Sequence, residues 1–191
     1  MLKSRPVRAA ASVALCALVL GLAACSSSES STSTTSKDAK STSTTNPYGA
    51  GVVDPPGPTD VVLTVTGPGG TRTFTMDQLA ALGTKDVTID EPFVKRRIAF
   101  TGVPMAAIFA TVGITGDVRV NTEALNEYIY DKSTAADFTG SDGLIAVAQE
   151  GQPVPVDQGG PIRIIFPDGT SLSKNLDAWN WSLEKMSVKG S

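Results

Sequence analysis

The sequence predicts an α+β domain that consists mostly of β-strands and contains a few short helices. Several stretches alternate apolar and polar residues, as in DVVLTVTG, which is the two-residue period of a half-buried strand. Turn signals such as PGG and PDG separate these stretches. Only two segments combine a helical apolar pattern with residues that start and stop a helix.

The first predicted elements are a β-hairpin and a capped helix. Residues 60–75 read as a hairpin because PGG at 68–70 joins two alternating segments. Thr75 can then cap the helix TMDQLAAL, with Gln78 completing a capping box. Gly83 is expected to end this helix.

The second helix is predicted over 103–113, with Pro104 in its first turn and Gly113 at its end. The remaining segments favour strands by their apolar content and their flanking turns. These strands are expected at 85–90, 95–102, around 118–120 and 128–130, at 143–151, at 160–169 and within 178–189.

Composition excludes several classes of function. The chain contains no histidine, which removes Ser-His-Asp and Cys-His catalysis in their usual form and most zinc sites. Beyond residue 24 it carries 13 Lys and Arg against 19 Asp and Glu, a net charge of −6. Because nucleic-acid binding depends on cations that neutralise phosphates, a nucleic-acid partner is not expected.

The N-terminus has the pattern of a secretory signal. Lys3, Arg5 and Arg8 precede the apolar run Ala9–Leu22, which is short for a permanent membrane span. The run leads into Leu-Ala-Ala-Cys, ending at Cys25, which resembles the lipobox of bacterial lipoproteins. In that family the cysteine receives acyl chains, such as palmitate, and becomes the first mature residue. The alternative is ordinary secretion with cleavage near Ala24 and an unmodified thiol.

The chain therefore divides into three parts. Residues 1–24 are the expected signal peptide. Residues 25–59 are the lipidated cysteine and a disordered tether, because 15 of the 20 residues at 26–45 are Ser or Thr and nothing large and apolar is present. Residues 60–191 form the expected domain, which places it outside the cytoplasm and anchored to the cell membrane.

Within this domain three blocks resemble the molybdopterin-binding domain of the sulfite oxidase superfamily. They are FTGVPMAAIFATVGI, LIAVAQEGQPVPVDQGGPIRIIFPDG and AWNWSLEKMSV, and their order and spacing follow the family over roughly 60–189. The resemblance implies a sulfite-oxidase-like fold. It also implies a cofactor whose molybdenum is held by the pterin dithiolene and by one protein thiolate.

The family's functional positions are only partly present. The thiolate would lie in 87–99, which contains no cysteine. Arg163, in the Gly-x-Pro-x-Arg strand, matches the arginine that helps to bind the phosphate side of the pterin. Gly159 and Gly160 belong to the same motif, and these three residues mark the expected vestigial cofactor cleft. Gln158 replaces the usual histidine, and Ala178 replaces the lysine before Trp179.

Other features favour structural roles over chemistry. The glycine-rich turns lack the spacing of a phosphate-binding loop. Arg96 and Arg97 are expected to be solvated, and Arg163 itself can be read as paired with an acid such as Asp157. The adjacent carboxylates Asp90 and Glu91 should point to opposite faces of a strand and make a poor acid/base pair. A surface loop is the preferred interpretation of Asp131, Asp137 and Asp142, because their spacing does not match a calcium loop.

From these observations the sequence predicts a non-catalytic binding module, with no catalytic residues, no bound metal and no required cofactor. Its partner would be an envelope protein or a small anion near Arg163. The alternative is a molybdopterin-dependent oxidoreductase of the envelope, and a plain spacer without a ligand is a third possibility. The leader lacks an adjacent arginine pair, which indicates export of an unfolded chain that could not carry a bound cofactor.

Overall fold

The computed structural model describes residues 54–188. The predicted signal peptide, Cys25 and most of the tether lie outside the described residues. Within 54–188, no helix has the length and apolar character needed to cross a membrane.

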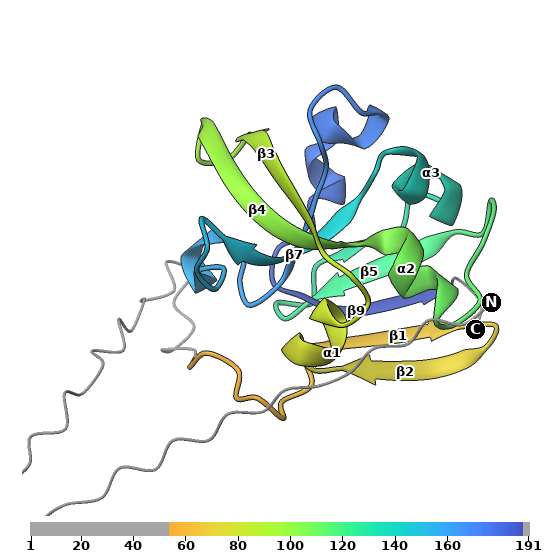
Figure 1. The fold of residues 1–191 in the computed structure, drawn as a ribbon. Helices are drawn as coiled ribbons and strands as arrows, with labels where there is room; N and C mark the ends of the chain where they lie inside the picture. The colour runs from red at the N-terminus through yellow and green to blue at the C-terminus, as the bar shows by residue number, and fades with distance from the viewer. Residues whose placement is uncertain (1–53, 189–191) are drawn as a thin grey trace, which may run out of the picture. The chain divides into compact units, whose positions relative to one another are not determined.

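Two β-sheets form the framework, and they lie one above the other in Figure 1. The first has five strands in the order β2-β1-β9-β5-β6, and the second has four in the order β3-β4-β7-β8. All neighbouring pairs are antiparallel except β1 and β9. The strands are β1 (Leu63–Gly67), β2 (Gly70–Phe74), β3 (Lys85–Glu91), β4 (Arg96–Pro104), β5 (Val120–Ala124), β6 (Ile129–Tyr130), β7 (Leu144–Gln149), β8 (Arg163–Ile165) and β9 (Leu183–Val188).

The helices of the described part are short. They comprise the α-helices α1 (Met76–Ala80), α2 (Met105–Ala110) and α3 (Ala135–Gly140), and the 3-10 turns η1 (Val156–Gln158), η2 (Ser171–Lys174) and η3 (Leu176–Ala178). The predicted capping box of α1 is present: Thr75 Oγ1 accepts the Gln78 amide, and the Gln78 side chain accepts the Thr75 amide. The prediction of a mostly β domain with a few short helices is confirmed.

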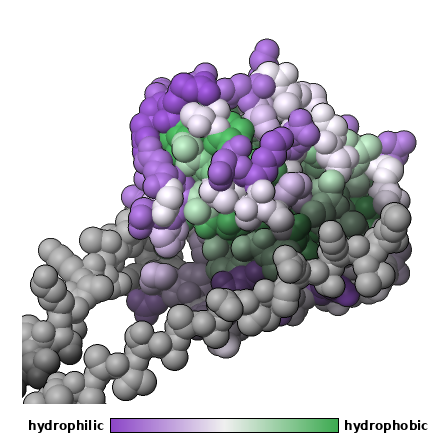
Figure 2. Space-filling view, viewed as in Figure 1, coloured by the Kyte–Doolittle hydropathy of each residue, from purple (hydrophilic) through white to green (hydrophobic). Residues whose placement is uncertain are grey.

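The core lies between the sheets and continues under the helices. One alternating set of strand residues points inward, as in β1, where Leu63 and Val65 are buried. Phe138 of α3 is fully buried and contacts three aromatic rings at centroid distances of 6.2 to 6.4 Å, those of Phe109, Tyr130 and Phe166. Figure 2 shows that on the outside polar residues cover much of this face, while apolar residues gather in limited areas.

Some boundaries differ from the predictions for local reasons. The second helix begins at Met105, because Val103 and Pro104 still pair with β7. The predicted strand 160–169 shrinks to the three residues of β8, because it is bounded by Pro161 and Pro167, which lack a backbone donor.

Helix α3 is absent from the sequence-based predictions, which assign this segment to a surface loop. Asp137 serves there in a second capping box with Thr134, and its carboxylate accepts the Thr134 amide at 2.8 Å. The pattern Thr-x-x-Asp before Phe138 was the missed signal. No group of three or more Cys, Asp or Glu among residues 54–188 is placed to hold a metal ion.

Candidate functional site

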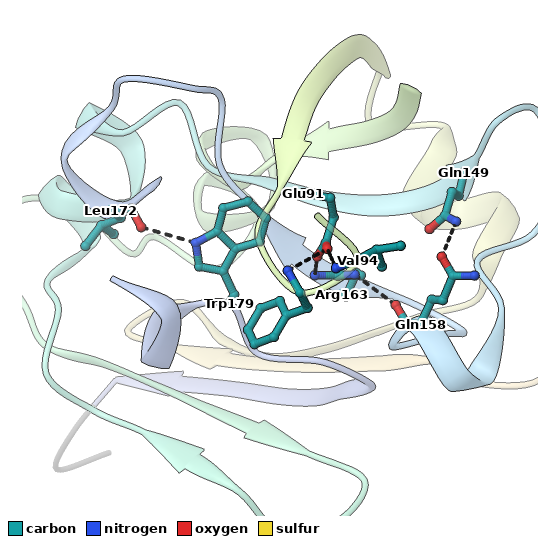
Figure 3. A network of polar contacts seen from close by, with 8 residues as sticks. Glu91, Val94, Gln149, Gln158, Arg163, Leu172 and Trp179 are labelled. Atoms are coloured by element: carbon teal, nitrogen blue, oxygen red, sulfur yellow. Dashed lines mark hydrogen bonds and ion pairs between the residues drawn. The ribbon is translucent and has the colours of Figure 1, made fainter. Parts of the chain in front are cut away.

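A buried ion pair connects the two edge strands of the four-stranded sheet. Arg163 begins β8 and Glu91 ends β3, and Arg163 Nη2 donates to Glu91 Oε1 at 2.7 Å. Both side chains are fully buried. The second terminal nitrogen, Nη1, donates to the carbonyl oxygen of Gln158 at 2.9 Å. Figure 3 shows the guanidinium lying between these two partners.

Glu91 also holds the turn between β3 and β4. Its second oxygen, Oε2, accepts the amides of Phe93 at 2.8 Å and of Val94 at 2.6 Å. Lys95, which closes the turn, has a φ of 58° and donates its amide to the Glu91 carbonyl oxygen. One carboxylate therefore neutralises Arg163 and orders the hairpin at the same time.

Aromatic rings enclose the guanidinium. The Arg163 Cζ atom lies 4.3 Å from the ring centroid of Trp181, and 5.9 Å from those of Phe100 and Trp179. A cation against an aromatic face is stabilised by the ring quadrupole. Phe93 packs against Trp181 in a T-shaped arrangement, with ring centroids 5.0 Å apart. We call the set formed by Arg163, Glu91, Phe93, Trp181, Gln149 and Gln158 the Arg163 cluster.

The electrostatics follow from this enclosure. Burial lowers the pKa of Arg163 to about 10, while the charge of Glu91 and its hydrogen bond act in the opposite direction. Arg163 is therefore still protonated at neutral pH, with Glu91 as its counter-ion. Removing one partner of such a pair leaves an uncompensated charge in the interior, which typically costs about 3–5 kcal/mol.

The glycines of the motif serve close packing. Gly159 has a φ of 88°, and a Cβ on it would lie 2.7 Å from Cγ of Trp181. A Cβ on Gly160 would clash with the carbonyl oxygen of Val154. Gly159 therefore allows the loop after η1 to pass directly against Trp181, and Gly160 allows the same loop to pass against the backbone of Val154.

Three polar atoms of the cluster have no hydrogen-bond partner among the described residues. They are the donors Arg163 Nε and Trp181 Nε1 and the acceptor Gln149 Oε1. The other end of the Gln149 amide donates to Gln158 Oε1 at 2.6 Å. The cluster thus contains two buried donors and one buried acceptor that form no hydrogen bond with the described residues.

Two surface cavities of the described part, of about 110 Å³ each, are not lined by any residue of the Arg163 cluster. One lies on the five-stranded sheet beside Thr64 and Asn121, and the other lies near Lys85 and Asp142. In this conformation Arg163 faces the interior of the protein.

The structure brings the predicted motif residues together. Arg163, Gln158, Gly159 and Trp179 all lie in or beside the cluster. The partner of Arg163 is Glu91, whereas Asp157, the acid considered in the sequence analysis, is exposed. This ion pair depends on the order in which β3, β4, β7 and β8 pair in the sheet. The spacing of residues in the sequence does not reveal that order.

The remaining charged candidates lie on the surface. Arg96 pairs with Glu150 at 2.6 Å and Arg97 with Asp168 at 3.1 Å, and all four side chains are partly solvated. The hydrogen bond with Glu150 raises the pKa of Arg96, and the hydrogen bond with Asp168 raises the pKa of Arg97. The adjacent carboxylates Asp90 and Glu91 do point to opposite faces, since Asp90 is exposed and Glu91 is buried.

Glu91 is the residue that sequence reasoning undervalued. In β3 the inward positions are Val87, Ile89 and Glu91, so a carboxylate stands where the alternation calls for an apolar residue. A charge at such a position is rarely left unpaired. That break in the pattern was the available signal for a buried cationic partner.

Comparison with known proteins agrees with the resemblance seen in the sequence. A family model described as the oxidoreductase molybdopterin binding domain matches residues 51–182. No curated protein matches the chain. Among solved structures, the crystal structure of the sulfane dehydrogenase SoxCD from Paracoccus pantotrophus matches with a TM-score of 0.51 and 13% identity. The match covers 74% of this chain and 41% of that chain, and at this identity it concerns the fold alone.

The cover formed by Phe93 can be tested by tryptophan fluorescence. The chain has two tryptophans, so a Trp179→Phe background leaves Trp181 as the only indole. We expect Phe93→Ala to shift the emission of Trp181 to longer wavelength and to increase quenching by acrylamide, because loss of the Phe93 ring exposes more of the indole to water. Val94→Ala, in the same turn, should leave both signals unchanged. Identical spectra for all three proteins would show that Phe93 does not cover the cluster.

Proposed function

The chain belongs to the oxidoreductase molybdopterin binding domain family, and from that premise we propose that it is a lipid-anchored protein of the cell envelope whose domain acts as a non-catalytic binding module. Two properties of the described residues support the non-catalytic part. One is the set of donor atoms available to bind a metal, and the other is that Arg163 already pairs with Glu91 and with the Gln158 carbonyl oxygen. The anchor is supported by the N-terminal sequence.

The residues present do not fit a molybdenum–dithiolene group. The resemblance calls for one protein thiolate, and soft thiolate ligands have no substitute of equal softness among oxygen or nitrogen donors. Residues 54–188 contain no cysteine, and the segment 87–99 instead forms β3, its turn and β4. Cys25 is the remaining thiol outside the signal peptide, and in our proposal it is acylated.

The state of Arg163 is the observation that carries the proposal. The family's arginine serves an anionic group of the cofactor, whereas Arg163 donates to Glu91 and to the Gln158 carbonyl oxygen in a fully buried position. An anionic ligand at this place would have to displace the Glu91 carboxylate and share the site with its charge. Two negative charges close together in the protein interior, here the ligand anion and the Glu91 carboxylate, repel each other strongly.

The anchor follows from position as well as motif. The basic residues, the apolar run and the small residues before Cys25 come in the order that a lipoprotein signal requires. Acyl chains on Cys25 would hold the chain at the membrane, and the following Ser- and Thr-rich segment would allow the domain to stand away from it.

The second candidate function is a molybdopterin-dependent oxidoreductase of the envelope. Family membership favours it, and so does the unpaired Arg163 Nε, a buried donor that a ligand could satisfy. Metal content separates the two candidates directly.

We expect protein produced in a host that makes molybdopterin to contain far less than one molybdenum per chain and no pterin fluorescence. The physical reason is the missing thiolate. Elemental analysis of the purified full chain measures the metal, with a sulfite oxidase from the same host as the positive control. Stoichiometric molybdenum, or reduction of a dye with sulfite as the electron donor, would support the oxidoreductase instead.

Acylation is tested by substitution at the two cysteines. Cys25→Ser should abolish incorporation of labelled palmitate and move the protein out of the membrane fraction, because the acceptor sulfur is lost. Cys16→Ser, inside the apolar run, is the matched control and should change neither result. Continued labelling of Cys25→Ser would place the anchor elsewhere.

A further inference from the structure

The outer face of the five-stranded sheet carries a cavity that the Arg163 cluster does not involve. It has a volume of about 110 Å³ and opens between β1, β9, β5 and β6. These strands lie side by side in the sheet, and β1, β9 and β5 are labelled in Figure 1. The cavity lies on the side opposite the core, since the neighbouring residues Leu63 and Val65 point inward.

Strand register places polar side chains in two rows across this face. Ser187 of β9 stands beside Thr66 of β1 and opposite Asn121 of β5. In the second row Lys185 stands between Thr64 and Glu123. Neighbouring strands are about 5 Å apart, so each row presents hydrogen-bonding groups at that interval.

Several of these groups have no hydrogen-bond partner among residues 54–188. The side chains of Thr64, Asn121 and Ser187 make no hydrogen bond to the described residues, and Asn121 Oδ1 is shielded from solvent without a partner. Thr66, in contrast, pairs with Thr71 at 2.9 Å between hydroxyl oxygens. The side chains of Thr64, Asn121 and Ser187 are partly exposed and line the cavity, so they can exchange hydrogen bonds with a molecule that brings hydroxyl groups.

The charged and apolar residues of the cavity limit the class of molecule that can bind there. Lys185 Nζ is held by Glu123 at 3.0 Å and Glu184 at 3.3 Å, so the cavity lining offers no uncompensated cation for a phosphate or carboxylate. Ile129 lines the cavity and is 57% exposed, which supplies an apolar surface beside the polar rows. A neutral ring with hydroxyls at its rim and C–H groups on its face matches both features.

We propose that this face binds a neutral saccharide, held by Asn121, Ser187 and Thr64 with the ring against Ile129. The inference names a ligand class for the proposed binding module, but it does not depend on the Arg163 cluster or on the metal content. Evidence against the proposed function would therefore not contradict saccharide binding at this face, and the reverse also holds.

The test titrates the full chain with glucose, N-acetylglucosamine and cellobiose, and follows saturable chemical-shift changes by NMR. We expect the largest changes at 64, 66, 121 and 187. Asn121→Ala and Ser187→Ala should each weaken binding by about fivefold or more, because each removes one hydrogen-bonding group. Thr64→Val should also weaken binding, while Thr88→Val, the same change on the exposed face of β3, should not.

Thermal unfolding of each variant confirms that it is folded, which these partly exposed positions favour. Absence of saturable binding of all three sugars would overturn the proposal. Equal affinity in Asn121→Ala, Ser187→Ala and the parent chain would also overturn it. The same holds if inorganic phosphate binds at this face in preference to the sugars.

Discussion

The ion pair between Arg163 and Glu91 is the constraint on which the rest of the four-stranded sheet depends. A charged guanidinium in the interior must find a counter-charge and acceptors, and here one carboxylate and one backbone carbonyl supply them. The same carboxylate accepts two amides of the β3–β4 turn, which brings Phe93 onto Trp181. Electrostatics, turn geometry and aromatic packing are thus coupled through a single side chain.

The two residues of this ion pair lie in the parts of the sequence in which the resemblance to the family places cofactor-binding residues. The family provides the scaffold of two sheets and the arginine of the Gly-x-Pro-x-Arg motif. In this structure the arginine pairs with Glu91, and the segment 87–99, in which the resemblance places a metal-ligating cysteine, contains Glu91 and its ordered turn. A further polar atom without a partner among residues 54–188, Asn121 Oδ1, belongs to a side chain that lines the cavity on the outer face of the other sheet.

Much of the fold could be predicted from local patterns, since the hairpin at 60–75 and the helix capped by Thr75 depend on short-range signals. The site could be predicted only in part. The motif identified Arg163 and its glycines, but the pairing with Glu91 joins residues 72 positions apart, and it follows from strand order. Helix α3 is not predicted, because Asp137, which caps it, is one of three carboxylates whose spacing favours a surface loop.

A double-mutant cycle between Glu91→Gln and Arg163→Met tests most directly whether the guanidinium is committed to the interior. Unfolding free energies of the parent, the two single variants and the double variant give the coupling between the two side chains. If the pair is committed, the coupling is at least about 2 kcal/mol, because each single variant leaves a buried group without its partner. A coupling near zero would contradict this account, since it would mean that Arg163 does not depend on Glu91 and is available to a ligand.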